Sequence, residues 1–304
     1  MHIEQVADSN KLLEYIHIKT EKVSAKIYPN LGGSLQELMI NGLRIIDGIS
    51  HDSEGLLDYQ STYRSSILFP FPNRIEDGAY DYLGESYQFP VNEKPLNNAL
   101  HGLVYNKQFE LISSETTDSS ASVVLAYSSI GKEPGFPFPF ELLLSYQISH
   151  KGDVALTFDV ENTGDSSFPM GMGWHPYFAV NNLENCQLTF PSRDFYKCNN
   201  RNLPVQTVKS GLSKSFKMDG KTFDDAYSLD KAICQLSAEN YNLELKFDYH
   251  EDTYLQVYTP PHRKNIAIEP MTTIANSFNH KIGFKELFPG KKDHWAIKLN
   301  ISLL

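Results

Sequence analysis

The chain has 304 residues, of which 41% are hydrophobic and 21% charged, an ordinary composition for a soluble globular protein that can bury a sizeable core. Its 27 Lys and Arg residues against 37 Asp and Glu residues give a formal charge of −10, which disfavours nucleic acids and anionic membranes as partners. No apolar run reaches the length of a membrane span, and the first residues lack the basic and apolar regions of a signal peptide.

The three cysteines, Cys186, Cys198 and Cys234, are odd in number, and no two have the CxxC spacing of zinc or redox sites. A disulfide framework is therefore disfavoured, and a reducing compartment fits this cysteine usage. We expect a cytoplasmic protein.

Five segments show the two-residue alternation or the short apolar runs of strands: residues 122–127, 142–148, 154–160, 243–249 and 296–303. Turn signals such as Asn41-Gly42 and Asp219-Gly220 punctuate the chain, whereas residues 7–15 could hold only a turn or two of helix. Many short strands and few helices predict an all-β fold, a large antiparallel sandwich.

The chain shows no linker rich in glycine, serine or charge and no obvious repeat, so we expect a single domain over residues 1–304. The Phe-Pro stretches at 69–72 and 136–140 predict loops or sheet rims, because proline interrupts strand pairing.

The segment 171–178 places one histidine, His175, between two glycines and Pro176. Glycine lets backbone approach a ligand closely, and a histidine can exchange protons near neutral pH. The segment also offers flat apolar surfaces of the kind that packs on sugar rings: Trp174, Tyr177 and Phe178. Taken alone, it is equally consistent with a bend whose histidine packs in the core.

Between residues 71 and 104 lie further polar candidates. Asn73 and Arg74 offer fixed hydrogen-bond donors for hydroxyl oxygens, and His101 before Gly102 is a second imidazole that could be presented to a ligand. The alternative is that Arg74 pairs with a surface acid and His101 caps a turn.

Glu269 follows an apolar run, and Pro270 is expected to end strand pairing directly after it. Burial there would raise the pKa of the carboxyl and make it a better general base, whereas an exposed strand end would leave it ordinary. Asp224 and Asp225 place paired acids beside aromatic residues, either to bind sugar hydroxyls or as a solvated loop.

Other site classes have little support in the sequence. There is no complete dinucleotide-binding glycine loop, no phosphate-binding P-loop and no GxSxG nucleophile motif. No histidine lies in an HxH or HExxH pattern, so we expect no metal site. A glycosidase with two carboxylates would leave the histidine segment without a role.

Taken in chain order, these segments resemble the aldose 1-epimerase (galactose mutarotase) family. The residues that carry the resemblance are Asn73-Arg74-Ile75, Gly78, Tyr80, Leu100-His101-Gly102, Gly135-Phe136-Pro137, His175-Pro176-Tyr177-Phe178, Asp224 and Glu269-Pro270. The resemblance covers nearly the whole chain. It implies an antiparallel supersandwich of the galactose mutarotase type with a sugar-binding cleft, and an isomerase that interconverts the α and β anomers of a free aldohexose such as glucose or galactose.

Carried over by motif, His175 resembles the general acid that protonates the ring oxygen, and Glu269 resembles the general base that takes the anomeric hydroxyl proton. His101, Arg74 and Asp224 resemble residues that position the sugar, with His101 assisting at the ring oxygen, Asn73 helping and Asp225 competing for the aspartate role. One acid and one base suffice, so no cofactor is expected. Their proximity is expected to favour an ionised Glu269 beside a protonated His175. The expected partner is a small sugar, bound by a monomer or homodimer.

Two alternatives remain open from the sequence. A hexose-6-phosphate 1-epimerase on the same fold would need cations around the C6 end of the cleft, for which Lys107, Arg201 and Arg263 are the candidates. A non-catalytic sugar-binding protein would keep the cleft without needing both His175 and Glu269.

Overall fold

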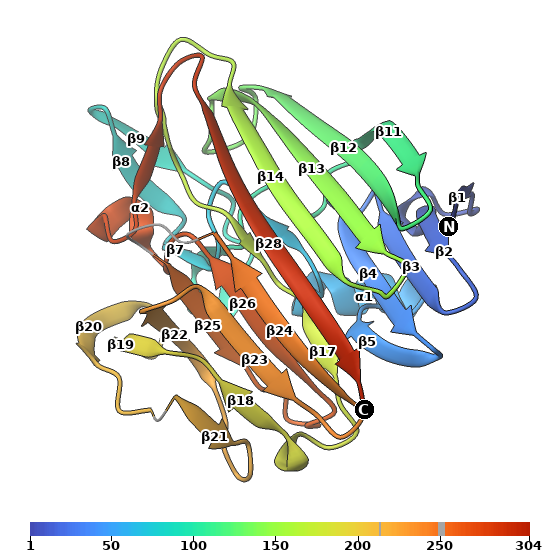
Figure 1. The fold of residues 1–304 in the computed structure, drawn as a ribbon. Helices are drawn as coiled ribbons and strands as arrows, with labels where there is room; N and C mark the ends of the chain where they lie inside the picture. The colour runs from blue at the N-terminus through green and yellow to red at the C-terminus, as the bar shows by residue number, and fades with distance from the viewer. Residues whose placement is uncertain (213, 249–252) are drawn as a thin grey trace.

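The computed structural model describes residues 1–212, 214–248 and 253–304, and strands dominate it (Figure 1). Two large antiparallel sheets supply most of the strands, with smaller two-stranded ribbons around them. The predicted all-β antiparallel sandwich is therefore confirmed. Over the same residues, no helix combines the length and the apolar character needed to cross a bilayer.

The first sheet supplies the floor of the candidate site described below. Its hydrogen-bonded order is β1 (His2–Val6), β2 (Tyr15–Lys19), β3 (Val23–Tyr28), β4 (Ser34–Ile40), β5 (Leu43–Asp47), β17 (Tyr177–Ala179), β26 (Asn265–Met271), β25 (Tyr254–Tyr258), β22 (Asp224–Leu229), β19 (Ser192–Cys198) and β20 (Pro204–Lys209). Off this path, β16 (Gly173–Trp174) pairs with β26 and with β6 (Ile67–Leu68). Because β17 and β26 pair side by side, chain segments 86 to 90 residues apart meet in the middle of this sheet.

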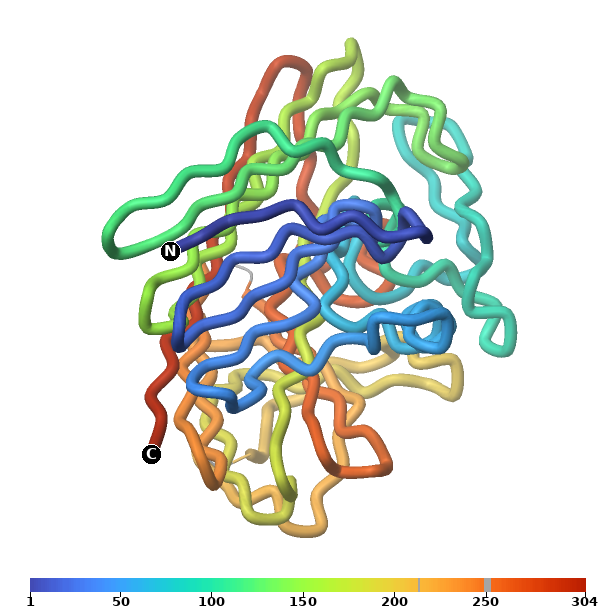
Figure 2. The backbone as a smooth tube through the Cα atoms, turned by 90° about the vertical axis from the view of Figure 1, so that its right-hand side faces the viewer, coloured from blue at the N-terminus to red at the C-terminus, as the bar shows by residue number. Residues whose placement is uncertain are grey.

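The second sheet covers the core from the other side. Its order is β11 (Glu110–Thr116), β12 (Ser120–Ile130), β13 (Pro139–Ser149), β14 (Val154–Asn162), β28 (Lys292–Leu303), β24 (Tyr241–Phe247), β23 (Ile233–Ser237), β18 (Gln187–Thr189) and β21 (Ser215–Lys217). At one edge of the sandwich, β1 lies beside β11, so the N-terminal strands run next to the green strands of the second sheet (Figure 2).

The remaining elements are short. The ribbons are β7 (Arg74–Glu76) with β10 (Asn98–Leu100), β8 (Ala79–Tyr82) with β9 (Glu85–Gln88), and β15 (Phe168–Met170) with β27 (Lys285–Leu287). The α-helices are α1 (Ser53–Thr62) and α2 (Ser277–His280), and single 3₁₀ turns occupy Lys11–Leu13, Lys94–Leu96 and Leu183–Asn185. The first of these turns lies inside the predicted segment 7–15.

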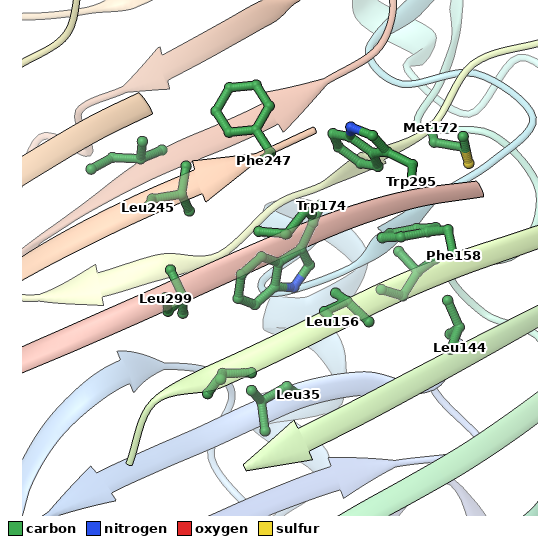
Figure 3. Close-up of a cluster of buried hydrophobic side chains, with 14 of the residues drawn as sticks. Leu35, Leu144, Leu156, Phe158, Met172, Trp174, Leu245, Phe247, Trp295 and Leu299 are labelled. Carbon is green, nitrogen blue, oxygen red and sulfur yellow. The ribbon is translucent and has the colours of Figure 1, made fainter. Parts of the chain in front are cut away.

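The core fills the space between the two sheets, and Figure 3 shows part of it around two tryptophans. Trp174 and Phe178 are fully buried there, so the prediction that they offer surface to a sugar is wrong. In strands β16 and β17, successive side chains point to opposite faces of the sheet, which sends these two rings inward. Of the three aromatic residues, Tyr177 alone lines a cavity.

The predicted strands fall within β12, β13, β14, β24 and β28, although β24 ends at Phe247 and residue 249 lies outside the described residues. Residues 69–72 and 136–138 lie outside the named strands, as predicted, and Pro139 opens β13 at a strand end where proline is tolerated. The proline prediction that is wrong concerns Pro270. Pro270 lies inside β26. On the edge of β26 opposite β25, the pairing with β17 ends at Ala267 and the pairing with β16 involves only Met271, so the N–H that proline lacks costs no hydrogen bond to a neighbouring strand.

Candidate active site

The floor of the site follows from the two-residue period of four neighbouring strands, β17, β26, β25 and β22. One set of alternating side chains packs in the core: Phe178, Ile268, Val257 and Tyr227. The opposite set lines one cavity of about 420 Å³: Tyr177, Glu269, Gln256, Tyr258 and Asp224. The strand register places these side chains next to one another across the sheet, since Gln256 pairs with Glu269 and Asp224 pairs with Tyr258. An apolar core and a polar cavity therefore share the same strands.

His175 is held at the entry to β17 by backbone contacts. Its N–H donates to Ser66 O at 3.0 Å, and its carbonyl accepts from Ser65 N at 2.8 Å. Trp174 holds the same two segments together from the core side, because its indole Nε1 donates to Ser65 Oγ at 3.2 Å. The histidine thus sits on the rim of the core, 6% exposed, with its imidazole in the cavity lining.

The β7–β10 ribbon brings a second set of residues over the floor. Leu100 pairs with Arg74, and the N–H of His101 donates to Asn73 O at 2.8 Å. Both Asn73 and His101 have positive φ, at 59° and 64°, a conformation that costs a non-glycine residue free energy and tends to occur at functional sites. Their side chains, with that of Arg74, line the cavity.

All six residues singled out from the sequence therefore line one cavity: Asn73, Arg74, His101, His175, Asp224 and Glu269. Asp225 is the next residue of β22 and does not line it. The three cations considered for a phosphate also lie elsewhere. Lys107 pairs with Glu133, Arg201 with Glu76 and Asp77, and Arg263 with Glu184.

Two residues that the sequence reasoning missed hold the polar side chains in place. Glu93 accepts three hydrogen bonds of 2.8–3.1 Å from the guanidinium of Arg74. Gln256 accepts from Asn73 Nδ2 at 3.3 Å and donates to Asp224 Oδ1 at 2.9 Å. A local signal for Gln256 existed, since it occupies a polar position in an apolar strand that pairs with Glu269. Nothing in the sequence indicated Glu93.

The acid and the base predicted from the sequence are in contact. His175 Nε2 lies 3.6 Å from Glu269 Oε1, and the two residues are 6% and 2% exposed. Next to them, the rings of His101 and His175 pack edge to face with centroids 5.0 Å apart. Among the described residues, His101 Nδ1, His175 Nδ1 and Glu269 Oε2 are buried without a hydrogen-bond partner. Such atoms are rare in folded proteins, and three of them lie together in this site.

Burial, rather than pairing, sets the protonation of His175 and Glu269. It lowers the pKa of His175 to about 3, helped by the charges of Arg64 and Arg74. It raises the pKa of Glu269 well above its usual value, helped by Asp224 and opposed by Arg74. The structure thus favours a neutral imidazole beside a protonated carboxyl, the reverse of the expected ion pair, because desolvation penalises both charges.

A stack of three flat groups supports His175 from the side. The rings of His175 and Tyr177 are parallel within 5° at a centroid distance of 5.2 Å, and the guanidinium of Arg64 lies 4.9 Å from the Tyr177 ring. Arg64 is fixed by ion pairs with Asp47 and Asp58, and Tyr177 Oη donates to Thr62 O at 3.2 Å. The stack restricts the orientation of the imidazole.

The charge of the cavity lining is negative. Its two arginines, Arg64 and Arg74, are both paired with carboxylates, and besides the protonated Glu269 the lining contains three acids, Asp58, Glu93 and Asp224. Over residues 1–212, 214–248 and 253–304, no three His, Cys, Asp or Glu side chains are arranged to hold a metal ion.

Comparisons with known proteins match this fold along the whole chain. The aldose 1-epimerase family profile covers residues 14–300. A solved galactose mutarotase-like protein from Clostridium acetobutylicum is 25% identical with a TM-score of 0.88, over 100% of this chain and 99% of that one. A galactose 1-epimerase from Lactobacillus acidophilus shares the fold, with a TM-score of 0.80 at 15% identity over 99% of this chain and 98% of that one.

Curated relatives agree with the family profile. The uncharacterized protein YihR of Escherichia coli is 25% identical over 271 residues, 86% of this chain and 85% of its own length. A maltose epimerase of Levilactobacillus brevis is 26% identical over 159 residues, 49% of this chain and 44% of its own. With a family profile that spans nearly all of its length, the chain belongs to the aldose 1-epimerase family.

Proposed function

We propose that this protein is an isomerase that interconverts the α and β anomers of a free aldohexose by general acid and base catalysis. The observation that carries the proposal is the buried contact between His175 and Glu269, 3.6 Å apart on the floor of the cavity. Ring opening of a hemiacetal needs one proton removed from the anomeric hydroxyl and one given to the ring oxygen, and this pair offers one base and one acid.

The protons balance within the pair. Glu269 as carboxylate takes the proton of the anomeric hydroxyl, the bond from C1 to the ring oxygen breaks, and His175 as imidazolium protonates that oxygen. Rotation about the C1–C2 bond turns the aldehyde, and the reverse transfers close the ring on its other face. The neutral pair favoured by burial holds the same number of protons, so sugar hydroxyls that donate to the carboxylate convert the pair to the charged form.

Arg74, Asn73 and Asp224 are positioned to orient the sugar. Their hydrogen bonds to Glu93 and Gln256 fix them before the sugar binds, which lowers the entropy cost of aligning the reacting atoms. His101 lies against His175 and is available as a second donor at the ring oxygen.

The cavity charge favours a neutral sugar over a phosphorylated one. Both arginines of the lining are neutralised by carboxylates, and Lys107, Arg201 and Arg263 pair with acids outside it. A dianionic phosphate group would therefore meet an excess of negative charge. A purely binding role leaves unexplained why a buried acid and base touch, since desolvating both is costly.

The test is anomer exchange followed by NMR for glucose, galactose and glucose 6-phosphate. We expect acceleration for at least one free hexose and little for the phosphate. Binding of these sugars without acceleration of any exchange would exclude an enzyme, and a preference for the phosphate would favour the hexose-6-phosphate alternative.

A further inference from the structure

The ring of His101 is oriented by packing against other rings. Its Nδ1 is buried and has no hydrogen-bond partner within residues 1–212, 214–248 and 253–304. The imidazole lies against the ring of His175, with centroids 5.0 Å apart, and against the ring of Tyr63, with centroids 4.8 Å apart and planes at 59°. A donor at the sugar ring oxygen has to be held at a fixed angle, so the contact with Tyr63 bears directly on that role.

Tyr63 has little freedom of its own. It caps the C-terminal end of α1 with a φ of 51°, a strained conformation for a tyrosine that tends to occur at functional sites. Its N–H donates to Tyr59 O at 2.9 Å, and the residue is only 6% exposed. The ring is therefore fixed where it meets His101.

One side chain ties the hydroxyl of Tyr63 to the strand that precedes His101. Asn92 Nδ2 donates to Tyr63 Oη at 3.1 Å and to Leu100 O at 3.0 Å, and Asn92 Oδ1 accepts from Leu100 N at 2.7 Å. Leu100 ends β10 directly before His101. The backbone that leads into His101 and the ring that packs on it therefore share one anchor.

The chain directly after Tyr63 holds the other histidine. Ser65 N donates to the carbonyl of His175, and the N–H of His175 donates to Ser66 O. The turn at the end of α1 thus contacts both histidines, through the ring of Tyr63 on one and through backbone on the other. It sets the position of the two imidazoles relative to each other.

Tyr63 also separates two cavities. It lines the catalytic cavity and a neighbouring one of about 470 Å³ beside α1. Loss of the ring would join the two spaces and admit water beside His101. Water would weaken the desolvation that, together with the charges of His175 and Arg74, lowers the pKa of His101 well below its usual value.

We propose that Tyr63 is a positioning residue for catalysis, whose aromatic ring holds the imidazole of His101 beside that of His175 so that it donates to the ring oxygen of the sugar. Tyr63 acts through His101 and transfers no proton itself. The inference rests on the proposed function and adds a residue to it.

The test measures kcat and KM separately for anomer exchange of a free hexose. Tyr63→Leu removes the flat face against His101 and should lower kcat by about tenfold or more. KM should stay within about twofold, because Arg74, Asn73 and Asp224 still orient the sugar. Tyr63→Phe keeps the ring and loses one hydrogen bond, so kcat should stay within about threefold.

A second background separates positioning from damage to the fold. In His101→Asn protein, Tyr63→Leu should change kcat by less than about twofold, because the group that it positions is gone. Tyr28→Leu is the matched control. Tyr28 is also a buried tyrosine outside the catalytic cavity, its ring stacks on Tyr15 at 5.4 Å, and its Oη bonds to His51. Its loss should leave kcat and KM of the folded protein unchanged.

The NMR titration of the His101 ring, assigned by its loss in His101→Asn, is a readout without turnover. The pKa should stay well below 6.5 in wild type and in Tyr63→Phe and should rise towards 6.5 in Tyr63→Leu. Tyr63→Met, closer in volume to tyrosine, should behave in the same way and serves if the leucine variant does not fold.

Three results would overturn the positioning role: a raised KM without loss of kcat, an equal loss of kcat with and without His101, or a titration of His101 that Tyr63→Leu leaves unmoved. Absence of exchange with every sugar in wild type would instead contradict the proposed function. The titration alone would then decide whether Tyr63 holds the ring of His101.

Discussion

The two faces of β26 carry opposite kinds of chemistry. Ile268 points into the core and is fully buried among apolar side chains. Glu269, the next residue, is nearly as buried, yet one of its oxygens has no hydrogen-bond partner among the described residues. One face thus stabilises the fold, while the other holds an unfavourable group in place. The difference indicates that the packing of the core face compensates for the free-energy cost of burying Glu269 on the cavity face.

The largest effect is expected on the cavity face. Glu269→Gln keeps the shape of the side chain but cannot exchange a proton, so anomer exchange should fall by about 10²–10⁴-fold. NMR exchange rates at saturating and limiting sugar measure it. A variant that folds and retains near-normal turnover would show that Glu269 is not the base.

The same variant should be more stable than wild type as pH rises. The folded pKa of Glu269 is raised, so above its usual value near 4.5 the unfolded carboxyl is ionised while the folded one is still protonated. Stability from this group is therefore lost as pH rises through that window, and glutamine removes the loss. Thermal unfolding at several pH values checks the sign.

The neighbouring core position should respond in the opposite way. Ile268→Ala opens a cavity in the packed core and should lower the free energy of unfolding by about 2–5 kcal/mol, with turnover per folded molecule nearly retained. Denaturant unfolding and NMR exchange on the same sample measure both. A large loss of turnover with little loss of stability would show that the two faces are not separable.

A milder contrast lies within β22. Asp224→Asn removes a charged partner for sugar hydroxyls and should lower kcat/KM by about 10–100-fold, the effect of one charged hydrogen bond. Asp225→Asn is the matched control outside the cavity and should leave activity nearly unchanged. Equal losses of kcat/KM in the two variants would contradict a sugar-binding role that belongs to Asp224 and not to Asp225.

The smallest effect is on the pH profile. The pair works while it holds one proton, so kcat/KM should stay level from neutral pH to well below 6.5, because burial lowers the pKa of His175 to about 3. It should fall at high pH, when Glu269 finally loses its proton. An acid limb centred near the ordinary histidine value would contradict the neutral pair.

Local alternation was sufficient to predict five of the strands, and the resemblance to the family brought the six cavity residues together. It could not show that Trp174 and Phe178 turn inward, since that depends on which face of β16 and β17 meets the second sheet. Glu93 was missed because its partner Arg74 lies nineteen residues away across a ribbon. The predicted protonation of His175 and Glu269 was wrong, because the sequence does not show how deeply the two side chains are buried.

The most direct test of the acid–base pair is a double-mutant comparison of His175→Asn, Glu269→Gln and both together, read as anomer exchange rates. If the two residues act as one unit, each single variant should lose nearly as much as the double variant. If the fold-loss of the exchange rate in the double variant equals the product of the two single losses, the residues act independently. That result would contradict a mechanism in which His175 and Glu269 share one proton.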